Sequence, residues 1–575
     1  MYRSRNLMRA AMMSSKIRSH LHTGGSQVAH EPDSVDRPTM QSRAYQLEMF
    51  EETLKRNTII CMSTGSGKTQ IAKLRIEAEL KRSPTKIVWF TAPSVALSQQ
   101  QYSYLSRQLP AHQFRIITSL DNVEHWSTQA IWDAALSNME VIVSTPQPLL
   151  DALSHGFIHM RRLSLLVFDE AHHCTKNAPM NKILQTFYHP AKQEGLVSEL
   201  PHILGLSASP ITSSKSTLES LERNMDAICK TPTLQIDEYR QFVHEPEFVA
   251  LPFMPVGQEL QPLVLSRLRR TIDSLDINDD PYVQFLRKSR SKKSQEKLGE
   301  ILENRGTSSV KQLQALDRRA NDLYCELGES ACTRFVAECA ARLHSSEANI
   351  NRSLPTLASQ EWKYLDTVLS QTGSDAMSLL KCKHPPDQIS AKAGVLFRLL
   401  LKEFTLGMRC VIFVKQRSTA WALSQLINLH PEFQGKYSAE PFVGLSKVDR
   451  NVQLVDLVKM RNPSEVLANF KSGKVNIVVA TSVMEEGVDI PATNLVIRFD
   501  DSENFRSFVQ SRGRARHPHS KFVTLLEGGC DGRPYQSWKA LEIEMKAKYA
   551  DEHRKIAEME EEEDLKKLFR VQSTG

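Results

Sequence analysis

A stretch of ten residues constrains the fold of this chain more than any other, namely Cys61 to Gln70 with the sequence CMSTGSGKTQ. It lies between an apolar run at Thr58 to Met62 and a helical pattern from Gln70 to Lys81. A strand, a glycine-bearing loop and a helix in this order are the context that a phosphate-binding loop requires. The stretch therefore predicts a site for a nucleoside triphosphate.

The residue types of this loop suit that chemistry. Gly65 and Gly67 let the backbone turn its N–H groups inward. Lys68 can reach the β- and γ-phosphates, and the Thr69 hydroxyl can bind Mg²⁺ at a helix N-terminus. One departure is that the general pattern begins with a glycine five residues before Gly67, where this chain has Met62.

A second strong signal is LLVFDEAH, from Leu165 to His172, an apolar strand that ends in two carboxylates. Asp169 is placed to hold Mg²⁺ through water, and Glu170 to orient and deprotonate an attacking water. The pair follows the phosphate-binding loop by about a hundred residues within a βα pattern. Together the two motifs predict hydrolysis of the triphosphate.

Size and composition leave room for several domains. A chain of 575 residues is long enough for about four domains. Its 41% apolar and 24% charged residues are ordinary proportions for a globular protein. No apolar run approaches the roughly 18 residues of a membrane span, so we expect a soluble protein without a membrane partner.

The net charge of +7 does not by itself indicate nucleic acid. Residues 1–30 contain five basic residues and no Asp or Glu, which leaves +2 for the rest of the chain. Residues 1–40 resemble an organellar transit peptide in composition, but a disordered basic tail or an over-extended start explains them as well. We expect residues 1–40 to be a disordered basic tail. We expect the protein to be cytoplasmic, with a nuclear location as the alternative.

Nine cysteines are scattered without a CxxC pair, so neither a zinc module nor a disulfide frame is indicated. Cys325, Cys332 and Cys339 recur at a spacing of seven residues. This spacing predicts one helix face and core packing rather than a metal site.

Other polar residues lie where an α/β sheet places ligand contacts. Arg43, Tyr45 and Gln46 open an amphipathic helix before the phosphate-binding loop, and Gln46 either reads an adenine edge or is a plain helix-surface residue. Thr145 follows an apolar strand at Val141 to Ser144, and the carboxyl ends of parallel strands gather ligand contacts. Ser207 to Pro210 (SASP) follows another strand and either relays the state of the phosphate site or forms a plain turn.

The pattern changes from residue 245 to residue 388, where helical periodicity dominates and no strand-like alternation stands out. Its basic cluster Arg287 to Lys293 either contacts phosphates or is a solvated loop. A βα pattern resumes at Lys392 and carries TSVMEEGVDIP at Thr481 to Pro491 and QSRGRAR at Gln510 to Arg516. Arginines in a second domain can reach across a cleft to stabilise phosphoryl-transfer charge.

We therefore predict two α/β domains of parallel sheet with an all-helical insertion between them. The predicted segments are a disordered basic tail (residues 1–40), a first α/β domain (41–244), a helical insertion (245–388), a second α/β domain (389–530) and a C-terminal helix (531–575). The acidic run Glu560 to Asp564 in the last segment is expected to be a solvated helix face.

The order TGSGKT, DEAH, SAS, ATSVMEEGVDIP and QSRGRAR resembles that of superfamily-two nucleic-acid helicases. Within that superfamily, AYQLEMFE, TAPSVALSQQQ and QSRGRARH are similar to the amino-terminal helicase of fungal Dicer-like proteins over about residues 42 to 530. The resemblance implies two RecA-like domains, ATP and Mg²⁺ as cofactors, double-stranded RNA as a partner, and a role in RNA silencing or antiviral defence.

The resemblance also implies a role for each motif residue. The implied catalytic residues are Lys68, Asp169, Glu170, Gln510, Arg514 and Arg516. The implied ATP contacts are Gln46, Thr64, Gly65, Ser66, Gly67, Lys68, Thr69, Gly487 and Asp489, with Thr69 and Asp169 as the metal ligands. The implied RNA contacts are Thr145, Thr481 and Ser482.

The usual dicing enzymes of that family continue into RNase III domains, and the stretch after Cys530 has no room for such a centre. We therefore expect an RNA-stimulated ATPase that does not cut RNA by itself and that works with a separate nuclease or silencing partner. Two alternatives stay open, a DNA-fork translocase of the same superfamily and an RNA-sensing module that has lost catalysis. The loss of catalysis is argued against by the presence of the motif residues Lys68, Asp169, Glu170 and Arg514.

Overall fold

The computed structural model describes residues 42–118, 121–209, 216–254, 261–350, 356–382, 389–405, 407–444, 453–458, 460–484, 488, 490–501, 504–528 and 533–550. The predicted tail at residues 1–40, the end of the predicted C-terminal helix, and the predicted ATP contacts Gly487 and Asp489 lie outside these residues.

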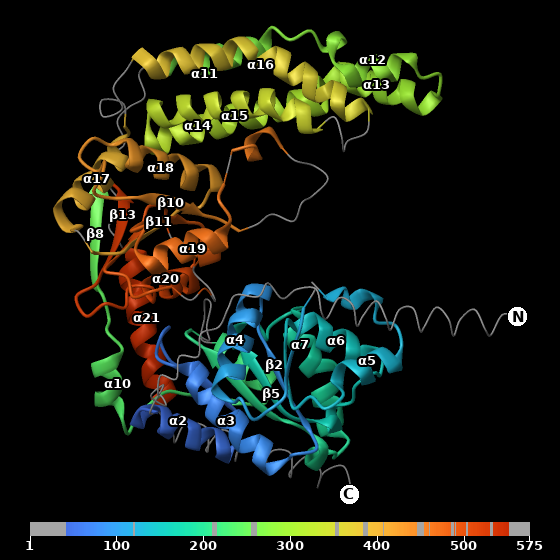
Figure 1. The fold of residues 1–575 in the computed structure, drawn as a ribbon, viewed down its shortest axis with the longest axis vertical. Helices are drawn as coiled ribbons and strands as arrows, with labels where there is room; N and C mark the ends of the chain where they lie inside the picture. The colour runs from blue at the N-terminus through green and yellow to red at the C-terminus, as the bar shows by residue number, and fades with distance from the viewer. Residues whose placement is uncertain are drawn as a thin grey trace, which may run out of the picture. The chain divides into compact units, whose positions relative to one another are not determined.

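The first domain is built on a parallel sheet in the order β3-β4-β2-β5-β6-β1-β7, of which Figure 1 labels β2 and β5. Its strands are β1 Thr58–Cys61, β2 Ile87–Thr91, β3 Phe114–Ile117, β4 Val141–Ser144, β5 Leu163–Asp169, β6 His202–Ser207 and β7 Ile228–Lys230. The strands predicted at β1, β4, β5 and β6 are confirmed. Parallel strands end at one edge, so the predicted loops meet there.

Both faces of this sheet are buried, which explains why its strands are continuous apolar runs. Ile60 of β1 packs under α2 (Ala44–Lys55), α3 (Lys68–Arg82) and α4 (Val95–Gln108). Ile59 faces the opposite core, which includes side chains of α5 (Gln129–Leu136), α6 (Pro146–Ser154), α7 (Pro179–Ile183) and α9 (Ser216–Met225). The alternation of adjacent strand residues between two cores fixes the strand register.

The second domain has a parallel sheet in the order β10-β11-β9-β12-β13-β8. Its strands are β8 Glu247–Phe253, β9 Cys410–Phe413, β10 Ala439–Phe442, β11 Ile477–Ala480, β12 Leu495–Arg498 and β13 Lys521–Glu527. One face is covered by α19 (Pro463–Ser472), α20 (Phe505–Arg512) and α21 (Arg533–Ala550), and the other by α17 (Ala391–Glu403) and α18 (Arg417–Leu429).

Strand β8 corrects the prediction that residues 245–388 contain no strand. Its seven residues pair in parallel with β13, so they belong to the second domain although the whole helical insertion follows them. Pro252 lies within the strand, and a proline in an apolar run argues against a central strand. Because β8 is at the edge of the sheet, the missing N–H is tolerated.

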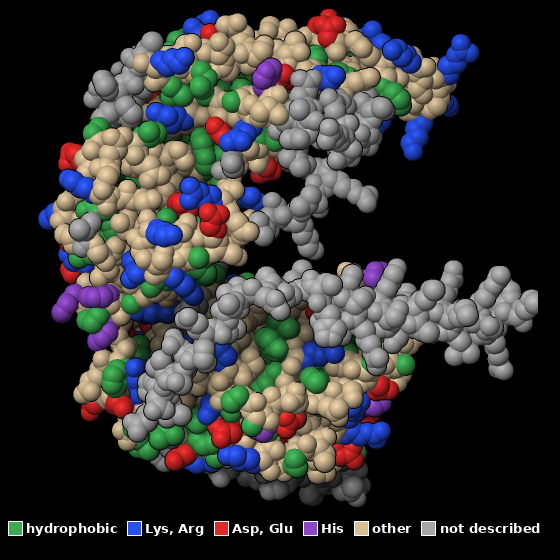
Figure 2. Space-filling view, viewed as in Figure 1, with side chains coloured by type: hydrophobic (Ala, Val, Ile, Leu, Met, Phe, Trp, Pro, Cys, Tyr) green, Lys and Arg blue, Asp and Glu red, His purple; other side chains and the backbone are tan. Residues whose placement is uncertain are grey.

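Between β8 and α17 every regular element of the described residues is a helix, as predicted. It contains α11 Leu263–Asp273, α12 Pro281–Lys288, α13 Lys292–Asn304, α14 Ser308–Leu327, α15 Glu329–Ile350 and α16 Thr356–Cys382. Helices α14 and α15 contact α18, so the insertion shares a hydrophobic core with the second domain. The basic cluster Arg287 to Lys293 spans the connection of α12 to α13, where Figure 2 shows Lys and Arg side chains on the surface.

The prediction that three cysteines share one helix face is wrong. Gly328 has a φ of 102° and ends α14, so Cys325 lies on α14 while Cys332 and Cys339 lie on α15. Cys332 and Cys339 are buried in the core and Cys325 is exposed. Among the described residues, no helix is both long and apolar enough to cross a bilayer.

Candidate active site

The predicted phosphate-binding loop joins β1 to α3, and its glycines have the backbone geometry that the motif requires. Gly65 and Gly67 have φ values of 84° and 86°, in the left-handed region that favours glycine. Gly67 is the residue before α3, so the first N–H groups of α3 point into the loop. The Ser66 hydroxyl is buried and has no hydrogen-bond partner among the described residues. These features fit an oxyanion ligand.

Lys68 is the first residue of α3 and folds back over the loop. Its ammonium donates to the carbonyl oxygens of Met62 and Ser63 at 2.9 and 3.2 Å. Burial lowers the pKa of Lys68, and the charges of Glu170 and Asp169 oppose this shift. The lysine therefore lies in the electrostatic field of both DEAH carboxylates.

Asp169 ends β5 and is 6% exposed. Its carboxylate accepts hydrogen bonds from Gln101 Nε2 at 2.7 Å and from the Glu170 backbone N–H at 3.1 Å. Burial and the neighbouring Glu170 raise the pKa of Asp169 to about 7, although Lys68 opposes them. Glu170 has a φ of 52°, which turns the chain sharply after the strand.

A hydrogen bond links the DEAH motif to the predicted SAS segment. His172 Nδ1 lies 3.2 Å from the Ser207 hydroxyl and 3.5 Å from Glu170 Oε2. Ser207 is the last residue of β6, the neighbour of β5 in the sheet. The Ser207 hydroxyl therefore contacts the DEAH motif through His172, and a relay of the phosphate-site state to the second domain stays a prediction.

Gln46 lies against the phosphate-binding loop, not on an open helix surface. Its Nε2 donates to the Ser66 carbonyl oxygen at 3.3 Å, and its Oε1 accepts from the Arg43 backbone N–H at 3.1 Å. A Cβ at residue 67 would collide with this Nε2, so Gly67 is required by the close approach as well as by its φ. In this structure both groups of the Gln46 amide bond to the protein, and adenine recognition by Gln46 stays a prediction.

The linker helix α10 (Ile236–Phe242) also contacts the loop, which the sequence analysis did not predict. The Tyr239 hydroxyl accepts from the Ser63 backbone N–H at 3.0 Å, and its ring packs edge-on against Tyr45 at 5.3 Å between centroids. The Tyr45 hydroxyl in turn donates to the Ser66 carbonyl oxygen at 2.8 Å. Two tyrosines from different helices therefore hold the backbone of the phosphate-binding loop.

The QSRGRAR segment brings the second domain to this loop. A Cβ at Gly513 would lie 2.9 Å from the Thr64 hydroxyl, and a Cβ at Gly65 would lie 2.7 Å from Arg516 Nε. Arg516 therefore lies directly over Gly65. Arg514 does not, because it is 2% exposed and its Nη1 donates to the Val488 carbonyl oxygen at 2.6 Å within its own domain.

Gln510 is buried in α20, so of the three predicted residues only Arg516 is placed at the phosphate-binding loop in this structure. The predicted RNA contacts follow strand ends in both domains. Thr145 directly precedes α6 after β4, Thr481 is buried after β11, and Ser482 is exposed at the same strand end.

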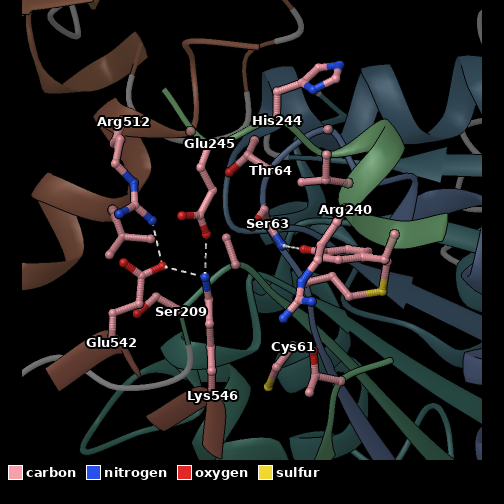
Figure 3. A pocket seen from close by; sticks show the side chains of 18 of the residues that line it. Cys61, Ser63, Thr64, Ser209, Arg240, His244, Glu245, Arg512, Glu542 and Lys546 are labelled. Carbon is pink, nitrogen blue, oxygen red and sulfur yellow. Dashed lines mark hydrogen bonds and ion pairs between the residues drawn. The ribbon is translucent and has the colours of Figure 1, made fainter. Parts of the chain in front are cut away.

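A cavity of about 760 Å³ opens beside the loop and is lined by both domains (Figure 3). The lining includes Ser63, Thr64 and Gly65 of the first domain and Gly513 and Arg516 of the second. The cavity is large enough for a nucleotide.

The chain offers few ligands for Mg²⁺, as is usual for magnesium that is bound together with phosphates. The described residues contain no group of three or more His, Cys, Asp or Glu that could hold a metal. Thr69 follows Lys68 at the start of α3, and Asp169 ends β5, so a hydroxyl and a carboxylate are the candidates. These oxygen donors suit a hard cation.

Sequence reasoning missed Gln101 and Tyr239. Gln101 had a signal, because it lies on the apolar face of α4 with Leu97 and Leu105, where a polar residue needs a partner. Tyr239 had none, because its contact with Ser63 spans 176 residues of sequence.

Comparisons with known proteins agree with this geometry. The family described as DEAD/DEAH box helicase matches residues 43–217, and the helicase conserved C-terminal domain matches residues 391–518. Dicer-like protein 2 of Coccidioides immitis is 41% identical over 548 residues, which cover 94% of this chain and 38% of that protein. Dicer-like protein 2-1 of Aspergillus niger is 38% identical over 554 residues, which cover 95% and 40%.

The chain thus spans 38% and 40% of the length of these two relatives. Among solved structures, it is similar to the helicase domain of Hef from Pyrococcus furiosus, with 21% identity and a TM-score of 0.44. That comparison covers 86% of this chain and 97% of the Hef domain.

Proposed function

The chain belongs to the superfamily-two helicases, as the helicase region of a fungal Dicer-like protein, and from this premise we propose that it hydrolyses ATP in a reaction stimulated by double-stranded RNA. The observation that carries the proposal is the convergence of Lys68, Asp169 and Arg516 around one loop. These groups come from three motifs and two domains.

The roles of the residues follow from their chemistry. Lys68 places a positive charge on the β- and γ-phosphates, and the N–H groups at the start of α3 bind phosphate oxygens. Thr69 and Asp169 hold Mg²⁺, which supplies charge neutralisation when it is bound. Gln101 orients the Asp169 carboxylate through its 2.7 Å hydrogen bond.

Glu170 orients the attacking water and accepts its proton. Its backbone has a φ of 52°, and its Oε2 atom lies 3.5 Å from His172 Nδ1. Arg516 adds a positive charge from the second domain, where charge develops on the transferred phosphoryl group. Hydrolysis therefore requires that both domains face the same nucleotide.

Stimulation by RNA follows if RNA favours the arrangement in which both domains contact ATP. Thr145 of the first domain and Thr481 and Ser482 of the second follow the ends of parallel strands, where hydroxyl groups can donate to phosphates of a nucleic-acid backbone. A duplex bound to both sets shifts the population toward the closed arrangement. A role in RNA silencing or antiviral defence, with a separate nuclease or silencing partner, would use this activity.

The experiment is ATP turnover by the purified chain with no nucleic acid, with duplex RNA and with duplex DNA of the same sequence. We expect duplex RNA to stimulate turnover and duplex DNA to do so much less. Stronger stimulation by DNA would instead indicate a DNA-fork translocase. Duplex RNA binding without turnover would indicate an RNA-sensing module.

A further inference from the structure

The last described helix, α21, contributes three ionic contacts beside the candidate active site (Figure 3). Glu542 Oε1 accepts from Arg512 Nη2 at 2.5 Å and lies 3.2 Å from Lys546 Nζ. Lys546 Nζ also donates to Glu245 Oε1 at 2.7 Å. Glu245 belongs to the linker between α10 and β8, so this ionic chain joins the linker, α21 and the QSRGRAR segment.

The central pair of this chain is largely withdrawn from water. The side chains of Arg512 and Glu542 are 14% and 13% exposed. Burial alone would raise the pKa of Glu542, but the charges and hydrogen bonds of Arg512 and Lys546 together lower that pKa. A charge-assisted pair with this burial is stronger than an exposed one, and the removal of one partner leaves a buried charge.

Helix α21 itself is anchored to the second domain and reaches the first. Tyr535 packs against Phe508 of α20 and Phe248 of β8, each with ring centroids 5.8 Å apart. Trp538 packs on Phe508 at 5.6 Å. The helix also contacts β7, the edge strand of the first sheet.

Arg512 is the last residue of α20 and directly precedes the turn that faces the phosphate-binding loop. That turn is held by backbone bonds from Gly513 to Val509 at 2.9 Å and from Ala515 to Arg512 at 3.0 Å. Its position is tight, because Gly513 packs on Thr64 without room for a Cβ. A shift of Arg512 would therefore move Gly513 and displace Arg516 from Gly65.

We propose that Glu542 is a positioning residue for ATP hydrolysis, which holds Arg512 so that the turn from Gly513 to Arg516 presents the Arg516 guanidinium to the nucleotide. Lys546 ties the same carboxylate to Glu245, so a movement of the linker between the domains is transmitted to this turn. The inference rests on the proposed function, since it concerns the rate of the same reaction. It gives a function to a helix to which the sequence motifs assign none.

The test compares the wild-type chain with Glu542→Gln, and with Glu544→Gln as the control, because Glu544 is exposed on the same helix. We expect Glu542→Gln to slow single-turnover ATP hydrolysis about tenfold to a hundredfold, the range for a misplaced reacting group, with ATP affinity changed less than about threefold. Glu544→Gln is expected to keep the wild-type rate. A wild-type rate in Glu542→Gln overturns the proposal.

A double-mutant cycle with Arg512→Gln separates positioning from a general loss of packing. If Glu542 acts through Arg512, the double variant is no slower than either single variant, because both remove the same interaction. If the rate losses of the two single variants multiply in the double variant, the proposal that Glu542 acts through Arg512 is overturned. Should Glu542→Gln lower the Tm enough to lose the fold, Glu542→Asp keeps the charge and is expected to show a smaller rate loss with the fold intact.

Amide hydrogen exchange gives a readout that does not depend on ATP turnover. The amides of residues 513–517 are expected to exchange faster in Glu542→Gln than in the wild type, while the amides of β5 and β9 keep their protection. Unchanged exchange in residues 513–517 overturns the proposal. A wild-type chain that does not hydrolyse ATP overturns the proposed function instead, and the exchange result still decides whether Glu542 holds the turn.

Discussion

The Tyr239 hydroxyl accepts a hydrogen bond from the backbone N–H of Ser63 across 3.0 Å, which links the interdomain helix α10 to the phosphate-binding loop. Removal of this hydroxyl leaves the ring contact with Tyr45 in place. A neutral hydrogen bond contributes about 0.5–1.5 kcal/mol, so we expect Tyr239→Phe to raise the Kd for ATP about threefold to tenfold. Tyr437→Phe is the matched control, since it loses a 2.7 Å bond to the Phe404 carbonyl oxygen away from the loop. Equal ATP affinities in the wild type, Tyr239→Phe and Tyr437→Phe would contradict the role of Tyr239.

The position of Arg516 over Gly65 predicts a catalytic effect. We expect Arg516→Ala to reduce single-turnover hydrolysis about a hundredfold to a thousandfold at saturating ATP and RNA, with a much smaller loss of ATP affinity, because the group acts mainly on transition-state charge. A wild-type rate in the folded variant would exclude this role for Arg516.

Arg514→Ala tests the catalytic role that the QSRGRAR motif implies for Arg514. The sequence predicts a loss of about two to three orders of magnitude for this variant as well. In this structure Arg514 bonds to the Val488 carbonyl oxygen, so its removal is expected to lower the Tm. A rate loss at an unchanged Tm would show that Arg514 reaches the nucleotide once RNA is bound, whereas a loss of both rate and Tm would support the structural role.

A half-buried carboxylate between the insertion and the second domain predicts a pH dependence of stability. Glu326 of α14 accepts from the Thr419 hydroxyl at 2.9 Å. Burial and the charge of Asp500 raise its pKa to about 7, and Lys392 opposes them. The folded protein therefore holds a proton on Glu326 that the unfolded chain releases above about pH 4.5, so stability is lost as the pH rises from about 4.5 to about 7.

Glu326→Gln removes this titration and keeps an oxygen that can accept from Thr419. We expect the variant to have the wild-type Tm near pH 5 and a higher Tm than the wild type near pH 8, measured by thermal unfolding at about these two values. A difference in Tm that is the same at both pH values would contradict the raised pKa.

Much of the fold could be predicted because its signals are local. The apolar runs at β1, β4 and β5 and the motif glycines indicate strand, loop and helix within a few residues. Strand β8 could not be predicted in its place, since Pro252 weakens the pattern and its partner β13 lies beyond the helical insertion. The seven-residue cysteine spacing misled because Gly328 separates two helices that continue the same apolar pattern.

In the candidate site, too, the residues with local signals could be predicted and those placed by distant contacts could not. Lys68 and Asp169 are recognisable from local motifs, because their spacing to glycines and strand ends is fixed by the chemistry of phosphate binding. Which arginine faces the phosphate-binding loop is not a local property, since Arg514 and Arg516 have the same charge and differ only in the direction that the turn gives them. Tyr239 and Glu542 depend on contacts between segments far apart in the sequence.

The central claim is that one ATP-hydrolysing site is assembled from both domains and depends on Lys68 and Glu170. It is tested most directly by ATP turnover in the presence of duplex RNA for the wild type, Lys68→Ala and Glu170→Gln, with circular dichroism to confirm the fold. We expect turnover in the wild type and none above background in either variant, while Glu170→Gln still binds ATP because it keeps its shape and loses only the base. Equal turnover in wild type and Lys68→Ala, or a folded wild type that turns over no ATP with duplex RNA, would contradict the account.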